Sequence, residues 1–184
     1  TVAAVDKRVK AIVPAVIDTL NVVPAFKHHF QAYGFWAPAV GNYVQEGIMD
    51  WMGTKEYDAL LRIEDPYHYR ERLTMPKLVL NASGDQFFLP DSSQFYFNAL
   101  PGEKEIRYVP NTKHDLSPSD VRENLASWYA AIVNKETRPH TDWTFEKDGS
   151  IHFRASGKPR ARLACLPVNR SRSGKPSVSQ APNA

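Results

Sequence analysis

"LVLNASGDQFFLPDSS" (residues 78–93) begins like a buried strand and ends in a polar loop. Its opening run of aliphatic residues, preceded by Pro76, is typical of a strand that is covered on both faces of a parallel sheet. The run stops at small polar residues, after which a carboxylate, Asp85, stands beside Phe87 and Phe88. We therefore expect a strand that leaves Asp85 at the rim of a sheet.

The neighbouring segments predict more elements of the same kind of fold. "VKAIVPAVID" (9–18) and "KEIRYVPN" (104–111) read as two further strands, although Pro14 argues against a regular central strand in the first of them. Residues 91–102 and 117–135 predict helices with polar caps and, in the second, an apolar stripe. Strands that alternate with helices in this way predict an α/β fold with a parallel sheet.

Composition divides the chain into a main body and a different C-terminal region. Residues 1–136 form the predicted α/β part, within which 24–73 has the apolar spacing of an aromatic-rich helical insertion. Residues 137–166 predict a short β-rich appendage that contains the hairpin "TDWTFEKDGSIHFRAS". Residues 167–184 are rich in Ser, Pro and Arg and have no apolar face to bury, so we expect them to be disordered.

The length, composition, net charge and cysteine count of the chain exclude some classes of partner and cofactor. The chain has 184 residues, 42% of them hydrophobic, which suits one globular domain. Its net charge is +3, with the excess of base in the last third but no interleaved aromatic residues, so no nucleic-acid partner is predicted. The single cysteine, Cys165, excludes an intrachain disulfide and a Cys-rich metal site. No apolar run is long enough to span a bilayer.

Two residues at predicted strand ends form a candidate catalytic pair. In α/β-hydrolases the acid and the histidine of the triad follow the nucleophile, in that order, on loops at the carboxyl ends of parallel strands. Asp85 leaves one predicted strand and His114 leaves the next. Asp85 would then accept the imidazole N–H, and His114 would act as general base and later as general acid. Asp18, at the end of the preceding predicted strand, is an alternative acid.

Two pairs of neighbouring residues, both phenylalanines or both histidines, can be interpreted as structural or as functional. Phe87 and Phe88 either line a substrate pocket or bury their loop against the helical insertion. His28 and His29 are adjacent on a predicted helix and point to different sides, which argues against a metal pair. No metal site and no cofactor is predicted.

Long stretches of the chain resemble the PhoPQ-activated pathogenicity-related protein family, a group with the α/β-hydrolase fold. The resemblance covers residues 1 to about 160, and its most specific motifs are "ASGDQFFLPDSSQF" (82–95) and "PGEKxxRYVPNxxH" (101–114). It implies a hydrolase-like, extracytoplasmic or secreted protein that cleaves an ester or amide in an unidentified small-molecule or peptide substrate. The family also includes a secreted regulator of proliferation, so the resemblance leaves open a non-catalytic signalling or binding protein that retains the fold.

The chain departs from the family pattern at both ends. A nucleophilic Ser in a Gly-x-Ser elbow, expected upstream of "TVAAVDKR" (1–8), does not occur in it. We therefore interpret the chain as the C-terminal part of such a hydrolase, inactive alone and liable to associate through an exposed sheet edge at 9–18. No signal peptide is found in a chain that starts at Thr1. Residues 165–184 do not continue the family pattern, which suggests a shifted reading frame or a truncated gene.

Overall fold

The computed structural model describes residues 1–156 of the chain. It divides into two compact units, Thr1–Thr137 and a second unit that begins at Arg138. The predictions for the end of the appendage and for residues 167–184 lie outside the described residues. The fold class is α/β with a parallel sheet, as the sequence predicted.

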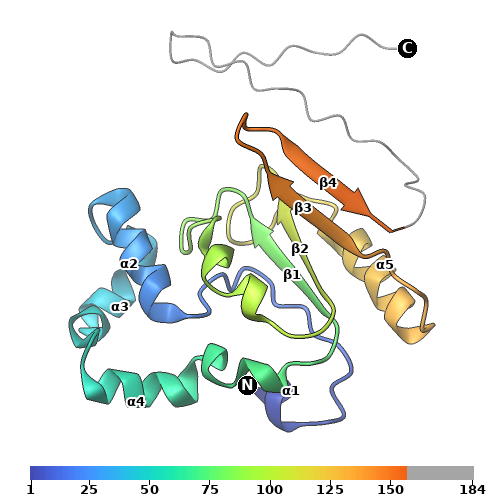
Figure 1. The fold of residues 1–184 in the computed structure, drawn as a ribbon. Helices are drawn as coiled ribbons and strands as arrows, with labels where there is room; N and C mark the ends of the chain where they lie inside the picture. The colour runs from blue at the N-terminus through green and yellow to red at the C-terminus, as the bar shows by residue number, and fades with distance from the viewer. Residues whose placement is uncertain (157–184) are drawn as a thin grey trace, which may run out of the picture. The chain divides into compact units, whose positions relative to one another are not determined.

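The helices and strands follow one another along the first unit and end in a hairpin in the second (Figure 1). The α-helices and strands are α1 (Val2–Val5), α2 (Val22–Tyr33), α3 (Gly41–Gln45), α4 (Lys55–Glu64), β1 (Lys77–Ala82), β2 (Lys104–Val109), α5 (Val121–Val133), β3 (Thr141–Phe145) and β4 (Ile151–Ala155). Short 3₁₀ helices occupy Pro38–Val40, Ile48–Trp51, Pro66–Arg72, Ser92–Phe95 and Phe97–Ala99.

The sheet of the first unit has β1 at its centre. Strand β2 pairs with β1 in parallel, from Lys77 opposite Lys104 to Ala82 opposite Val109. On the other side of β1, residues 12–15 make two parallel bridges rather than a continuous strand. Pro14 explains the gap, because the amides of residues 12 and 16 donate to the carbonyls of Pro76 and Leu80, and a proline between them has no N–H to donate. Three chain segments therefore run side by side towards the same edge.

One face of this sheet is closed by α5. Leu78, Leu80 and Ala82 of β1 alternate along the strand and pack with Val109 of β2 against Trp128. All of these side chains are buried. Figure 1 shows α5 on one side of β1 and β2, and helices α2, α3 and α4 on the other. A sheet covered on both sides explains why the strand β1 reads as an unbroken apolar run.

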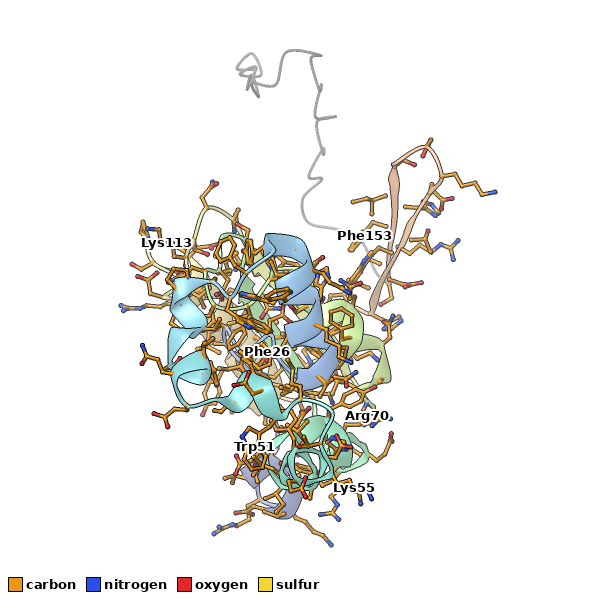
Figure 2. All side chains as sticks on the ribbon, turned by 90° about the vertical axis from the view of Figure 1, so that its left-hand side faces the viewer. Phe26, Trp51, Lys55, Arg70, Lys113 and Phe153 are labelled. Atoms are coloured by element: carbon orange, nitrogen blue, oxygen red, sulfur yellow. The ribbon has the colours of Figure 1, made fainter. Side chains whose placement is uncertain are left out.

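The helical region between residues 22 and 64 has its own aromatic core. Phe26 of α2 is buried with Val40 and Met49, and Phe88 from the loop after β1 joins them. Figure 2 shows Phe26 among the side chains inside this layer, whereas Trp51, which is about half exposed, lies at its surface. Helices α2, α3 and α4 lie in the segment for which the sequence predicted a helical insertion, and Phe88 joins this region to the end of β1.

Two predicted helices differ in the structure. Residues 92–99 form two 3₁₀ turns and no α-helix. The sequence offered Asp91 or Ser92 as the cap of the predicted helix, but the Asp91 side chain makes no capping bond and its carboxylate binds His28. Helix α5 begins at Val121, after Asp120, and not at the predicted start near residue 117. In both places polar side chains that suit a cap have other partners, which local sequence does not reveal.

The second unit contains the predicted hairpin. Strands β3 and β4 are antiparallel, with Thr141 opposite Ala155 and Phe145 opposite Ile151. The turn between them contains Gly149, whose positive φ of 83° suits a residue without a side chain. Trp143 and Phe153 stand opposite each other on one face, while polar residues occupy the alternate positions.

A buried lysine, Lys77, closes the end of the sheet away from Asp85. Its Nζ atom donates to the carbonyl oxygens of Leu73, Met75 and Pro101 at 2.6–2.7 Å. Burial lowers the pKa of Lys77 to about 8, so the amine is still charged at pH 7. The side chain therefore joins the segment before β1 to the segment before β2.

Replacing Lys77 by methionine is expected to destabilise the unit by roughly 3 kcal/mol, because three carbonyls, one buried and two partly buried, lose their donor at once. Urea unfolding followed by circular dichroism would measure the change. Lys104→Met is the matched control, since Lys104 donates to two carbonyls, those of Asn98 and Leu100, and is less buried. A smaller effect for Lys77→Met than for Lys104→Met would contradict this role.

Candidate active site

Asp85 is positioned by the turn that ends β1. The backbone amides of Ser83 and Gly84 bond to the carbonyls of Val109 and Thr112, so the turn stays beside the end of β2. The Asp85 side chain is 3% exposed, and its Oδ1 accepts from the amides of Phe87 and Phe88 at 2.7 and 3.1 Å. Small residues before the aspartate permit this tight turn, and two backbone donors fix its carboxylate.

His114 meets that carboxylate from the loop after β2. Its Nδ1 lies 2.9 Å from Oδ2 and 3.1 Å from Oδ1 of Asp85. Its backbone amide donates to the side-chain oxygen of Gln86, 3.2 Å away, which ties the two loops together. Since an ionised carboxylate only accepts, Nδ1 carries the proton and Nε2 of the neutral ring is left as an acceptor. The structure thus brings together the two residues that the sequence proposed as acid and base.

The backbone at Gly84 packs closely against Thr112, which lies in the loop that carries His114. A Cβ atom on Gly84 would lie 3.0 Å from the carbonyl oxygen of Thr112, which is buried two residues before His114. The amide of Asn111 also donates to the Ser83 hydroxyl at 3.0 Å. The "NASGD" turn therefore needs glycine at position 84 for the approach of Thr112.

Gly84→Ala is expected to destabilise the unit by roughly 1–3 kcal/mol, because the added methyl group must displace Thr112. Chemical denaturation would measure the loss. Gly41→Ala is the matched control, because Gly41 has helical φ and ψ and open space around its missing Cβ, so alanine there should be neutral or stabilising. Equal effects of the two substitutions would rule out the proposed crowding.

The sequence left two roles open for Phe87 and Phe88, which are lining a substrate pocket and packing against the helical insertion. The ring of Phe87 is centred 4.4 Å from that of His114, and the ring of Phe88 6.0 Å from it. Phe88 is buried in the helical core, and Phe87 is partly buried against the same core. Packing against the insertion is therefore observed for both residues, and a pocket-lining role is a prediction.

Asp18 is buried close to this site but does not bond to His114. It is 2% exposed, and burial raises its pKa from the usual 3.8 to about 7. Tyr96 and Asn81 lie close enough to lower that pKa part of the way back. Neither makes a hydrogen bond of good geometry with the carboxylate within the described part of the chain. The structure thus pairs His114 with Asp85 and not with the alternative acid.

The serines near the site have other partners. The Ser83 hydroxyl accepts from Asn111, Ser93 bonds to the hydroxyl of Tyr108, and Ser119 donates to the carbonyl of Leu116. Among residues 1–156, no side chain hydrogen-bonds Nε2 of His114. Asp85 and His114 thus contact each other, and within residues 1–156 no serine side chain hydrogen-bonds to His114.

A second His–Asp pair was not anticipated from the sequence. Nε2 of His28, on α2, lies 2.9–3.0 Å from both carboxylate oxygens of Asp91. Its neighbour His29 is buried and accepts from the amide of Ala37, so the two rings do point apart as predicted. The contact joins residues far apart in sequence, and neither local pattern signals it.

The described residues contain neither a metal-binding cluster nor a helix that could cross a membrane. No group of three or more His, Cys, Asp or Glu side chains there is arranged to hold a metal ion. None of the helices within residues 1–156 has both the length and the apolar character needed to cross a membrane.

The chain is similar to one protein family, to a curated relative and to a solved structure. The family described as PhoPQ-activated pathogenicity-related protein matches residues 1–168. Autocrine proliferation repressor protein A of Dictyostelium discoideum is 39% identical over 150 residues, which cover 78% of this chain and 30% of that protein. The chain thus spans about a third of the length of this curated relative. A monoacylglycerol lipase of Paleococcus ferrophilus matches with a TM-score of 0.37 and 13% identity, over 70% of this chain and 60% of the lipase.

Proposed function

Because this chain belongs to the PhoPQ-activated pathogenicity-related protein family, we propose that Asp85 and His114 are the acid and base of a Ser-His-Asp triad that hydrolyses an ester or amide. The observation that carries the proposal is the contact of 2.9 Å between Nδ1 of His114 and Oδ2 of Asp85. The two side chains come from loops after adjacent parallel strands, in the chain order that α/β-hydrolases use.

The proposal gives each side chain a role that its contacts support. Asp85, fixed by two backbone amides, accepts the Nδ1 proton of His114 and stabilises the imidazolium that forms during catalysis. Nε2 of His114 takes the proton of the nucleophile and later delivers it to the leaving group. The nucleophilic serine would come from sequence that precedes α1, as would the donors that stabilise the oxyanion.

The cellular setting of the proposed reaction follows from family membership alone. We infer that the intact protein works outside the cytoplasm, as its resemblance to the family implies. The substrate would be a small molecule or peptide with an ester or amide bond. The ring of Phe87, which packs against His114, would contact the part of the substrate next to the scissile bond.

A non-catalytic role is the second candidate, and the 39% identity to a protein named as an autocrine proliferation repressor favours it. In that case the fold would serve as a secreted signalling or binding surface. The Asp85–His114 contact would then hold two loops together, as the Gln86 contact also does.

Turnover of activated acyl esters and anilides by the protein with its preceding sequence decides between these functions. Hydrolysis that disappears in His114→Ala supports the enzyme. A folded protein that neither turns over these substrates nor reacts with a serine-directed probe supports the binding protein. His28→Ala is the matched control, since it removes the other His–Asp pair and should leave turnover unchanged.

A further inference from the structure

His29 is a buried histidine of α2 that the proposed mechanism does not use. The residue is 3% exposed, and its Nε2 atom accepts a hydrogen bond of 3.1 Å from the backbone amide of Ala37. A ring nitrogen that accepts from an N–H carries no proton itself, so this contact requires the neutral form of the imidazole. The structure therefore holds His29 in a form that acid removes.

The contact fixes the corner that follows α2, which consists of residues 34–37. Gly34 ends the helix with a positive φ of 75°, and three residues later the chain lies against the ring of His29. The amides of residues 35–37 make one hydrogen bond within the described part of the chain, and it is the bond from Ala37 to His29. The position of the corner therefore depends on the state of one ring.

Trp36, in the middle of the corner, packs on that ring. The rings of Trp36 and His29 are stacked, with centroids 5.8 Å apart and planes 26° apart. Trp36 also meets Phe26 edge to face at 6.1 Å, which joins the corner to the aromatic core that contains Phe88. Release of the corner would therefore loosen packing that extends to the loop after β1.

The groups that face His29 offer no anion to a charged ring. His28 adjoins it on α2 and opposes a second positive charge there. Tyr33, one turn further along the helix, presents its ring edge to face at 4.9 Å. The corner contributes Trp36 and no charged side chain. The 3₁₀ turn that packs against α2 brings Asp91 close, but this carboxylate binds His28.

We propose that His29 is an acid-sensitive latch, which holds the corner on the aromatic core while its ring is neutral and releases the corner when its ring is protonated. An imidazolium has no acceptor for the amide of Ala37, and two N–H groups would then face each other. A charged ring without an ion-pair partner is also costly to bury, so it moves towards water and away from Trp36. The latch does not depend on the proposed function.

The sign of the effect follows from the burial of the ring. Burial, and to a lesser degree the charge of His28, lower the pKa of His29 below its usual value of 6.5. The released corner exposes the ring, so it binds a proton more readily than the closed corner does. The closed corner therefore keeps its full stability above about pH 6.5 and loses stability progressively from there down to the lowered pKa.

Hydrogen exchange of backbone amides, followed by NMR in the full chain, tests the proposal. Between pH 7 and pH 4 the protection factor of the Ala37 amide is expected to fall by roughly fivefold or more, as for the loss of one hydrogen bond. The fall should follow the titration of the His29 ring signals. The amide of Leu80 in β1, which donates to Pro14, should keep its protection, and this separates release of the corner from unfolding of the sheet.

Two variants on α2 make the test specific to one ring. His29→Gln keeps a side-chain acceptor that does not titrate, so the protection of the Ala37 amide should no longer depend on pH. His28→Gln is the matched control, because the ring of His28 binds Asp91 and not the corner. It should leave the pH dependence at Ala37 in place.

Three results would each overturn the latch. They are equal protection of the Ala37 amide at pH 7 and pH 4, loss of its protection together with that of Leu80, and a pH dependence that persists in His29→Gln. If His29→Gln does not fold, the wild type decides alone, because different midpoints for the His29 ring and the Ala37 amide would also overturn the proposal.

Discussion

Replacing Asp85 by asparagine in the protein with its preceding sequence is expected to lower kcat/KM for ester hydrolysis by roughly 10³–10⁴-fold. The amide no longer accepts the Nδ1 proton as a carboxylate does, so the ring is not held with Nε2 free to accept the proton of the nucleophile. The backbone amides of Phe87 and Phe88 retain a side-chain oxygen as partner, so the fold should survive. Steady-state kinetics with an activated ester measure the effect.

Asp18, the alternative acid, provides the control for this prediction. Asp18→Asn should change kcat/KM by much less than Asp85→Asn, because Asp18 makes no hydrogen bond to His114 in the structure. The reverse order, with Asp18→Asn as the more damaging substitution, would transfer the role of triad acid to Asp18. Circular dichroism of both variants separates lost chemistry from lost folding.

Asp18→Asn is also expected to make the protein more stable above neutral pH, by roughly 2–4 kcal/mol. The folded state holds the proton of Asp18 up to a pKa of about 7, whereas the unfolded chain releases it near 3.8. Between these values the folded state binds more protons, so the free energy of unfolding falls as pH rises and levels off above about pH 7. Asparagine removes this penalty, because it does not ionise.

Urea unfolding at several pH values checks the prediction. At pH 4 and below the two proteins should differ little, and the gap should open between pH 4 and pH 7. Asp58→Asn, on the exposed face of α4, should show no such pH-dependent gap. A wild-type protein whose stability does not fall over this range relative to Asp18→Asn would show that Asp18 ionises normally.

Much of the fold was predictable because its signals are local. The apolar run of β1 and the alternation of β3 and β4 depend on residues close together in sequence, and so does the cap of α4, where the Thr54 side chain accepts from the amide of Tyr57. The effect of Pro14 was predictable for the same reason, since a missing N–H interrupts a strand wherever it stands. The order of Asp85 and His114 after successive strands was enough to place them near each other.

The features that escaped prediction depend on contacts between distant residues. Asp91 looks like a helix cap, but His28 from α2 takes its carboxylate, and residues 92–99 form 3₁₀ turns. In the sequence, Asp18 is an alternative acid at the end of a predicted strand. Only the folded structure shows that it is buried with Asn81 and Tyr96 and makes no hydrogen bond to His114. Such differences arise in tertiary structure, where local pattern carries no information.

The central claim is that Asp85 and His114 are the acid and base of a serine hydrolase site. Its most direct test is the rate at which a fluorophosphonate probe labels the protein with its preceding sequence, compared between the wild type and His114→Ala. We predict labelling of a serine upstream of α1, with a fall of roughly 10³-fold or more in His114→Ala and no change in His28→Ala. Equal labelling of the wild type and His114→Ala, or none in a folded wild-type protein, would contradict the claim.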